Sequence, residues 1–105
     1  MKRGLTEICY GFFSTLANPT RLAVLEKLMD GPMNVSSLSE ALGQEQSMVS
    51  HNLKPLERCG LISVERRGKE KIYKLQGDTV EKLFGVVKNH AESYCPFRGA
   101  CADSK

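Results

Sequence analysis

A stripe of polar side chains follows one side of the segment from residue 46 to residue 59. On the opposite side, Val49, Leu53 and Leu56 recur at helical spacing, which predicts an amphipathic helix with one face in a core. Short hydroxyls and an amide at the start of the stripe suit close hydrogen bonds to base edges, and the cations further along suit phosphates. The stripe consists of Gln46, Ser47, Ser50, His51, Lys54 and Arg58. A solvated face of an ordinary core helix would show the same pattern.

Two residues depart from this pattern. Glu45 stands where a serine cap would be expected, and its carboxylate suits the helix dipole but repels phosphate. Pro55 lies inside the segment, where it removes the hydrogen bond to the carbonyl of His51 and predicts a bend. Both weaken the case for a face that binds nucleic acid.

Cysteines near the carboxyl end form a second group with its own chemistry. Cys95 and Cys101 flank a loop with proline and glycine that could fold one sulfur onto the other. Such thiolates suit a soft metal ion or metalloid, or a reversible disulfide, although a flexible tail is the plain alternative. Cys9 lies on an apolar stripe, where a small buried side chain is the common role. Cys59, just before Gly60, is expected to be in the core.

Length and composition limit the class of protein. The chain has 105 residues, of which 41% are hydrophobic, and this suits one domain that is small for an enzyme with a deep cleft. No apolar run is long enough to cross a bilayer, so we expect no membrane partner. The stretch after Lys2 and Arg3 loosely resembles a secretion signal, but Glu7 interrupts it and helical spacing continues through it. We therefore expect a cytoplasmic protein whose cysteines are thiols or ligands.

Four helices are predicted before residue 60. The first follows from apolar residues at helical spacing, which are Leu5, Ile8, Cys9, Phe12, Phe13 and Leu16. The other three are bounded by cap and stop signals, namely Asn18-Pro19 with Gly31-Pro32, Asn34 with Gly43, and Gly60 after the segment 46–59.

A hairpin and a last helix complete the predicted order. Residues 61–75 place β-branched and aromatic side chains on both sides of Arg67-Gly68-Lys69, which predicts two strands with an exposed tip. Asp78 with Glu81 has the form of a capping box and opens a helix that ends near Tyr94. Five helices and a two-stranded wing in this order predict a mainly α winged helix-turn-helix over residues 1–94, with residues 95–105 as a tail. The fourth helix would then be able to enter a DNA major groove, which is about 12 Å wide.

Positive charge is concentrated on the predicted hairpin. Residues 65–74 hold two carboxylates, Glu65 and Glu70, against five cations, Arg66, Arg67, Lys69, Lys71 and Lys74. This excess of three equals the net charge of the whole chain, +3. Such a tip would lie along phosphates and give salt-dependent affinity for DNA of any sequence. The alternative is that the lysines only protect an exposed strand edge.

Three segments together resemble the ArsR/SmtB family of small, dimeric, metal-responsive winged-helix repressors: LANPTRLAVLEKL, LSEALGQEQSMVSHNLKPLERCGLI and RRGKEKIYKL. The resemblance covers nearly all of residues 12–94. It implies a homodimer formed by the first and last helices, binding to an inverted repeat in promoter DNA, and repression that an inducer relieves. Two-fold symmetry would place the half-sites about 34–36 Å apart, or a multiple of that distance.

The family's usual sensor positions are mostly vacant. Met33, Val35 and Ser37 occupy the place where the arsenic and cadmium type has thiolates. The zinc type uses four ligands on the last helix, of which Asp78 and His90 alone could correspond. No four-ligand site of that type can therefore be built.

Three of the four cysteines are left as the candidate sensor. In a dimer of the kind that the family implies, Cys9 of either protomer could approach Cys95, with Cys101 as a third sulfur. A site of two or three thiolates suits trivalent arsenic, and the same arrangement would allow a reversible disulfide or polysulfide link. Binding of DNA would itself need no cofactor.

Other classes of function are less well supported. A thiol oxidoreductase using Cys95 and Cys101 would lack the Cys-x-x-Cys spacing and the βαβ setting that activate such thiols, so we expect no enzyme. The alternative is a winged-helix module that binds DNA or protein without sensing an inducer.

Overall fold

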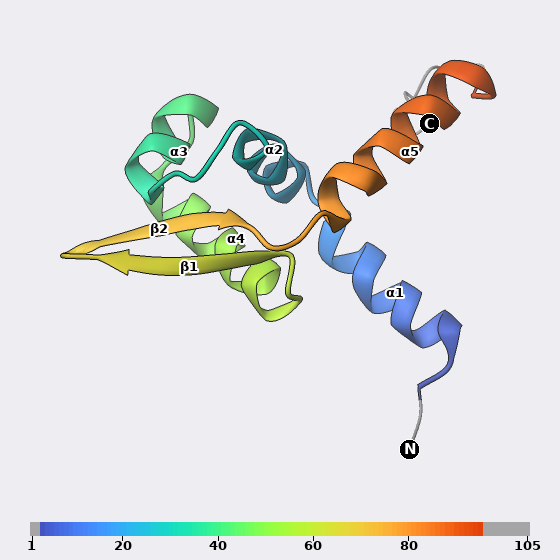
Figure 1. The fold of residues 1–105 in the computed structure, drawn as a ribbon, viewed down its shortest axis with the longest axis horizontal. Coiled ribbons are helices and arrows are strands. Elements are labelled where there is room, and N and C mark those ends of the chain that lie inside the picture. Colours follow the sequence, from blue (N-terminus) through green and yellow to red (C-terminus); the bar gives the residue numbers. More distant parts are fainter. Residues whose placement is uncertain (1–2, 96–105) are drawn as a thin grey trace.

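The computed structural model describes residues 3–95, and Cys101 and most of the predicted tail lie outside them. Five helices and one antiparallel hairpin follow in the expected order, so the predicted winged helix-turn-helix is confirmed (Figure 1). The elements are α1 (Leu5–Leu16), α2 (Pro19–Leu28), α3 (Val35–Leu42), α4 (Gln46–Arg58), β1 (Ile62–Arg67), β2 (Glu70–Leu75) and α5 (Thr79–Ser93). No helix among residues 3–95 is long and apolar enough to span a membrane.

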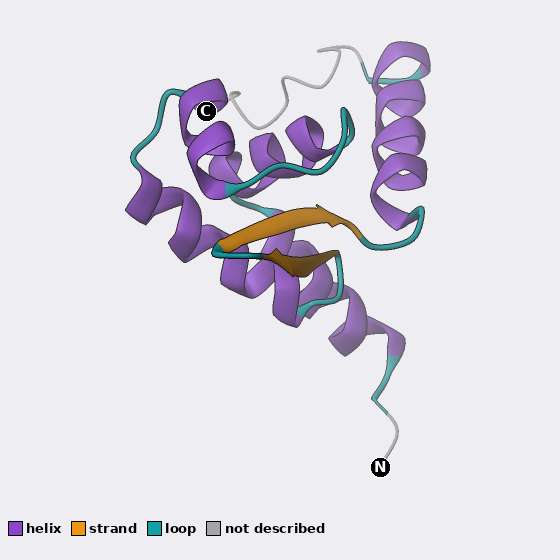
Figure 2. Cartoon of the chain, turned by 60° about the vertical axis from the view of Figure 1, so that its left-hand side comes forward, coloured by secondary structure: helices purple, strands orange, loops and turns teal. Residues whose placement is uncertain are grey.

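The core lies among α2, α3, α4 and the base of the hairpin. Its buried apolar side chains include Val24, Leu25, Leu38, Val49, Leu53, Leu56, Leu61 and Ile62. By contrast, α1 buries Leu16 and α5 buries Val80, and both helices extend away from the rest (Figures 1 and 2). The first and last helices therefore leave most of their apolar side chains uncovered in a single protomer.

The caps expected for α2 and α3 are present. The Asn18 side chain accepts a hydrogen bond from the Arg21 backbone at 3.1 Å, and the Asn34 side chain accepts one from the Ser37 backbone at 2.7 Å. Each bond satisfies a backbone N–H that the first turn of a helix leaves unpaired. The Asn34 amide also donates to Glu70 of β2 at 3.2 Å, so one side chain ties α3 to the hairpin.

Replacing Asn34 with alanine is expected to lower the free energy of unfolding by about 1 kcal/mol, because the Ser37 N–H loses its acceptor. Denaturant titration measures the change. Ser37→Ala is the matched control, since it removes an exposed hydroxyl and leaves that N–H in its bond to Asn34. Equal losses in the two variants would contradict the capping role.

A glycine ends α4 as the sequence predicts. Gly60 has φ 79°, a left-handed conformation that glycine adopts without steric cost. The Gly60 N–H donates to the carbonyl of Glu57, and the Leu61 N–H donates to that of Leu56, both at 3.0 Å. These two bonds form a Schellman motif, which returns the chain so that Leu61 enters the core.

Two of the expected roles near helix ends are wrong. Cys59 is exposed, because the chain leaves the helix there and Leu61 fills the core position instead. Asp78 precedes α5 but makes no side-chain cap bond, since its φ and ψ of −116° and 11° are not those of an extended capping residue. Its carboxylate instead pairs with Lys82 at 3.0 Å on the exposed side of the helix.

The hairpin is joined to the core at one end and free at the other. The two-residue turn Gly68-Lys69 connects β1 and β2, with Arg67 opposite Glu70. At the base, Tyr73 exchanges two backbone hydrogen bonds with Met33, of 2.8 and 2.9 Å. Burial raises the pKa of the Tyr73 hydroxyl, and the nearby Glu57 carboxylate raises it further, so the phenol stays neutral.

Candidate nucleic-acid interface

The polar stripe of α4 lies on the surface, opposite the side that enters the core. Five of its six side chains are exposed and Ser50 is half-buried. Val49, Leu53 and Leu56 on the other side are almost fully buried, which fixes which face of the helix looks outward. The exposed members are Gln46, Ser47, His51, Lys54 and Arg58.

Side-chain bonds hold the turn between α3 and α4. Gln44, in that turn, accepts a hydrogen bond from the Thr20 hydroxyl at 3.1 Å through its side chain, and its carbonyl accepts one from the Ser39 hydroxyl. The Gln46 amide donates to the Ser36 hydroxyl at 3.2 Å. Gln46 is therefore held against the start of α3, whereas the side chains of Ser47 and His51 make no hydrogen bond within residues 3–95.

The two unusual residues of α4 have different consequences. Glu45 precedes the helix with an exposed carboxylate and makes no side-chain cap bond. Pro55 lies inside the helix, which continues past it to Arg58. The stripe is thus carried by one continuous helix, with one carboxylate at its amino end.

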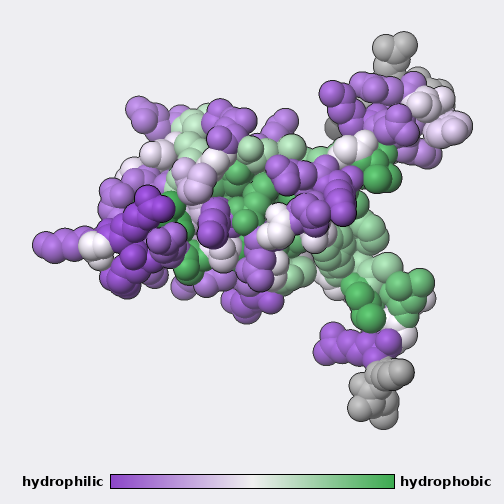
Figure 3. All heavy atoms as spheres, viewed as in Figure 1, coloured by the Kyte–Doolittle hydropathy of each residue, from purple (hydrophilic) through white to green (hydrophobic). Residues whose placement is uncertain are grey.

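The cations predicted for the hairpin are all exposed, and all but Lys74, which pairs with Ser63 near the base, lie near its tip. Arg66 lies directly opposite Lys71 in the register, and like charges in that position repel. Arg67 is 3.6 Å from Glu65 in an exposed ion pair, an arrangement that contributes little. Figure 3 shows mostly hydrophilic residues at the tip. A hairpin surface on which cations of the two strands lie opposite each other suits an anionic ligand such as a phosphate backbone.

The cysteines do not form a ligand cluster within the described part of one protomer. Cys9 on α1 is half-buried beside Tyr10 and Phe13, and Cys95 is half-buried just past α5. Among residues 3–95, no three histidine, cysteine or acidic side chains are placed to hold a metal ion. The far ends of α1 and α5 point away from each other in both ribbon views (Figures 1 and 2). Meeting of the sulfurs near those ends would therefore require a second protomer.

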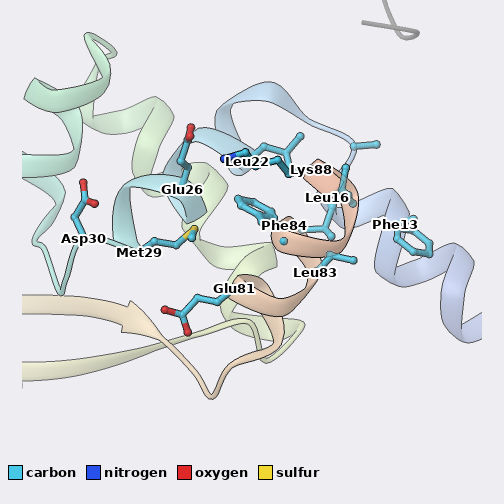
Figure 4. Close-up of a pocket in the computed structure, with 13 residues that line it drawn as sticks. Phe13, Leu16, Leu22, Glu26, Met29, Asp30, Glu81, Leu83, Phe84 and Lys88 are labelled. Atoms are coloured by element: carbon cyan, nitrogen blue, oxygen red, sulfur yellow. The ribbon is translucent and has the colours of Figure 1, made fainter. Parts of the chain in front are cut away.

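An apolar groove lies between α1, α2 and α5. It has a volume of about 860 Å³, and Phe13, Leu22, Met29, Phe84 and Val87 are among the side chains that line it (Figure 4). More apolar surface continues along the same helices, and Figure 3 shows hydrophobic residues gathered over α1. Its further exposed members include Leu5, Ile8, Tyr10 and Tyr94. Apolar surface of this extent marks a binding face for another molecule.

Sequence reasoning missed two functional candidates, Arg21 and Asn52. Asn52 is the one buried polar residue of the described chain, and its carboxamide accepts a hydrogen bond from the Arg21 guanidinium. The available signal was an asparagine directly before Leu53, on the side of the helix that carries Val49 and Leu56. A polar residue on a buried face requires a partner.

A family model described as "Bacterial regulatory protein, arsR family" matches residues 18–64. The regulator NmtR of Mycobacterium tuberculosis is 42% identical over 77 residues, which are 73% of this chain and 64% of NmtR. The nodulation protein NolR of Rhizobium meliloti is 35% identical over 83 residues, which are 79% of this chain and 68% of NolR. The chain thus spans about two thirds of each of these relatives.

A solved structure has the same fold. The homodimeric winged helix-turn-helix DNA-binding domain of Mb0332 from Mycobacterium bovis, fragment 1–100, superimposes with a TM-score of 0.76 at 28% identity. The superposition covers 90% of this chain and 93% of that domain. The likeness therefore includes the first and last helices as well as the part that the family model matches.

Proposed function

Because the chain belongs to the ArsR family of bacterial regulatory proteins, we propose that it is a homodimeric repressor that binds an inverted repeat in promoter DNA. Its winged helix-turn-helix is that of DNA-binding transcriptional regulators and not that of an enzyme. The observation that carries the proposal is the exposed polar stripe of α4, which occupies the second helix of the helix-turn-helix. In this fold the second helix enters the major groove.

The proposed docking divides the contacts into two classes. Ser47, Ser50 and His51 lie in the amino-terminal half of α4, which reaches base edges in this docking mode, and Gln46 would join them by leaving Ser36. Lys54 and Arg58 lie further along, where backbone contacts are usual. The hairpin cations Arg66, Arg67, Lys69 and Lys71 would follow the phosphates beside the groove.

The experiment selects DNA duplexes from a random-sequence library with the wild-type protein and then measures affinity for the selected and a scrambled duplex. We expect His51→Ala and Ser47→Ala each to cost about 1–3 kcal/mol on the selected duplex, because each loses a base contact. Affinity for the scrambled duplex should not change. Ser93→Ala is the control, since it removes an exposed hydroxyl at the end of α5.

Two outcomes would favour the alternative function. Selection without any enriched sequence, at fixed salt, would indicate an architectural DNA-binding module. Absence of DNA binding altogether would indicate a winged helix that binds proteins. Either result would reject the promoter-binding repressor.

The proposed dimer uses the apolar faces of α1 and α5. The groove between these helices and the uncovered side chains beside it support this choice, and the related Mb0332 domain is homodimeric. A two-fold dimer explains an inverted repeat, because each protomer presents its α4 to one half-site. Repression follows if the dimer occupies DNA that the transcription machinery needs.

For the inducer we propose sensing at Cys9, Cys95 and Cys101. Their thiolates suit a soft metalloid such as trivalent arsenic. In the redox version two thiols form one disulfide, and the two electrons pass to an oxidant such as a polysulfide. The divergence of α1 and α5 supports a site shared by two protomers rather than one built within a single chain.

Titrating the protein–DNA complex with arsenite, and separately with polysulfide, tests the sensor. We expect one of the two to release the wild-type protein from DNA and to have no such effect on Cys95→Ser, because that variant lacks a required sulfur. Cys59→Ser is the matched control, since it removes an exposed thiol at the end of α4 and should respond like the wild type. If neither reagent loosens the wild-type complex, the cysteine sensor is rejected and the DNA-binding function stands.

A further inference from the structure

Arg21 connects the end of α1 with the middle of α4. Its Nε donates a hydrogen bond to Oδ1 of Asn52 at 3.0 Å, and its Nη1 donates one to the carbonyl of Thr15 at 3.1 Å. The Arg21 backbone is itself fixed in the first turn of α2 by its bond to Asn18. One side chain, held at its root, therefore bonds to two other helices.

Both partners of the guanidinium are neutral oxygens. Among residues 3–95, the ion pairs do not include Arg21, although the side chain always carries its charge. A charge that is half-buried without a carboxylate depends on its hydrogen bonds, and the planar guanidinium fixes their directions. The two hydrogen bonds of Arg21 thus define how α1, α2 and α4 are oriented relative to one another, in addition to holding them together.

Asn52 is placed to transmit that geometry to α4. It is 4% exposed, and its Nδ2 donates to the carbonyl of Met48 at 3.0 Å, one turn back along the same helix. Val49, Leu53 and Leu56 pack α4 against the core even without the Asn52 side chain. Because apolar contacts are not directional, they set the rotation of the helix about its axis only approximately. The directional Arg21–Asn52 hydrogen bond fixes how α4 is rotated about its own axis. Rotation decides where Ser47 and His51 point.

We propose that Arg21 and Asn52 are positioning residues that hold the DNA-reading face of α4 in register with the end of α1. The inference rests on the proposed function, in that α4 must be the helix that reads DNA. Because α1 belongs to the proposed dimer interface, the same bonds would link the dimer to the orientation of each α4. A displacement at Thr15 would then reach Asn52 through one side chain.

The test measures sequence preference, which is the ratio of affinities for the duplex selected by the wild-type protein and a scrambled duplex. In Asn52→Leu, of similar volume, we expect this ratio to fall by about tenfold or more, the cost of about one base contact. Affinity for the scrambled duplex and its salt dependence should stay as in the wild type, since the phosphate contacts are unchanged. Circular dichroism and sedimentation confirm that the full-length variant is folded and dimeric.

Two further variants keep the inference falsifiable if Asn52→Leu does not fold. Arg21→Lys retains the charge but has one nitrogen in place of the two that reach Asn52 and Thr15, so its ratio should fall similarly. Asn52→Asp retains an acceptor for Arg21 but loses the donor to the Met48 carbonyl, so its ratio should lie between those of Asn52→Leu and the wild type. A purely structural role would lower stability in these variants and leave the ratio unchanged.

The outcomes separate this inference from the function on which it rests. If the wild-type protein shows sequence preference and folded Arg21→Lys or Asn52→Leu retains it in full, the positioning role is overturned and the proposed function stands. If the wild-type protein shows no preference for any duplex, the proposed function fails and the inference fails with it. A combined Arg21→Lys and Asn52→Leu variant that is no worse than either single variant would support one shared interaction.

Discussion

Replacing Val87 with aspartate is expected to convert the proposed dimer into monomers and to lower affinity for the selected duplex by about 10²–10⁴-fold. Val87 is 55% exposed in a single protomer and lines the groove between α1, α2 and α5. In the proposed interface its side chain would be covered, and an aspartate there would bury a carboxylate without a partner. A monomer engages one half-site at a time and loses the effective concentration that a second linked helix provides. Sedimentation equilibrium and titration of the selected duplex measure the two effects.

The neighbouring residue supplies the control for that change. Val86 is also exposed on α5 but does not line the groove, so Val86→Asp introduces the same side chain outside it. We expect Val86→Asp to remain dimeric at concentrations where Val87→Asp is monomeric. The opposite result would place the interface on another face of α5, and two dimeric variants would reject α5 as an interface helix.

The expected dissociation also has a consequence for stability. A single protomer buries Leu16 from α1 and Val80 from α5, so these helices have few buried contacts of their own. Elements with few buried apolar contacts open at low free energy. The variant should therefore lose helix content on mild heating before the core of α2, α3 and α4 unfolds, whereas the wild-type dimer should not.

The parts of the fold that the sequence predicted correctly depend on local geometry. Asn18 and Asn34 cap helices through bonds to residues three positions on, and the turn at Gly60 ends α4 through bonds between residues three and five positions apart. Such spacings can be recognised in a single sequence because they do not depend on the rest of the fold. The apolar period of α4 likewise predicted its buried and exposed faces.

The errors and omissions have physical reasons of their own. Asp78 carries the residue type of a cap, but its backbone angles and the exposed ammonium of Lys82 decide where its carboxylate lies. The prediction that Cys59 lies in the core is wrong because the Schellman turn places Leu61 in the core position instead. The bond between Arg21 and Asn52 joins residues 31 positions apart, and no local pattern announces it. For the binding site, the sequence correctly predicted that the polar stripe of α4 faces outward. The contacts of that stripe with DNA, and the approach of the cysteines to one another, stay predictions.

A double variant of the hairpin, Arg66→Ala with Lys71→Ala, should lower affinity for every duplex alike. Each protomer would lose two phosphate contacts, so a dimer would lose four. The slope of log affinity against log salt should become shallower by about 3.6, and affinity at about 0.1 M salt should fall by about a thousandfold. The ratio between selected and scrambled duplexes should not change, because these side chains lie on the hairpin and not on α4.

The same double variant should be slightly more stable than the wild type when free of DNA. Arg66 and Lys71 are directly opposite in the hairpin register, and removing two like charges should raise the free energy of unfolding by about 0.2–1 kcal/mol. A rise in the free energy of unfolding together with a fall in DNA affinity would show that Arg66 and Lys71 serve binding and not the stability of the hairpin. Titrations over a range of salt concentrations and denaturant unfolding measure the two quantities.

Removal of the same charge elsewhere provides the comparison that this result needs. Lys27→Ala on α2 with Lys82→Ala on α5 takes two lysines from exposed ion pairs with Asp30 and Asp78. If net charge alone governed binding, this pair would flatten the salt dependence as much as the hairpin pair does. We expect instead a change of less than about one in the slope, because lysines that touch no phosphate release no counterions. Equal slopes in the two double variants would mean that the hairpin does not contact the DNA backbone.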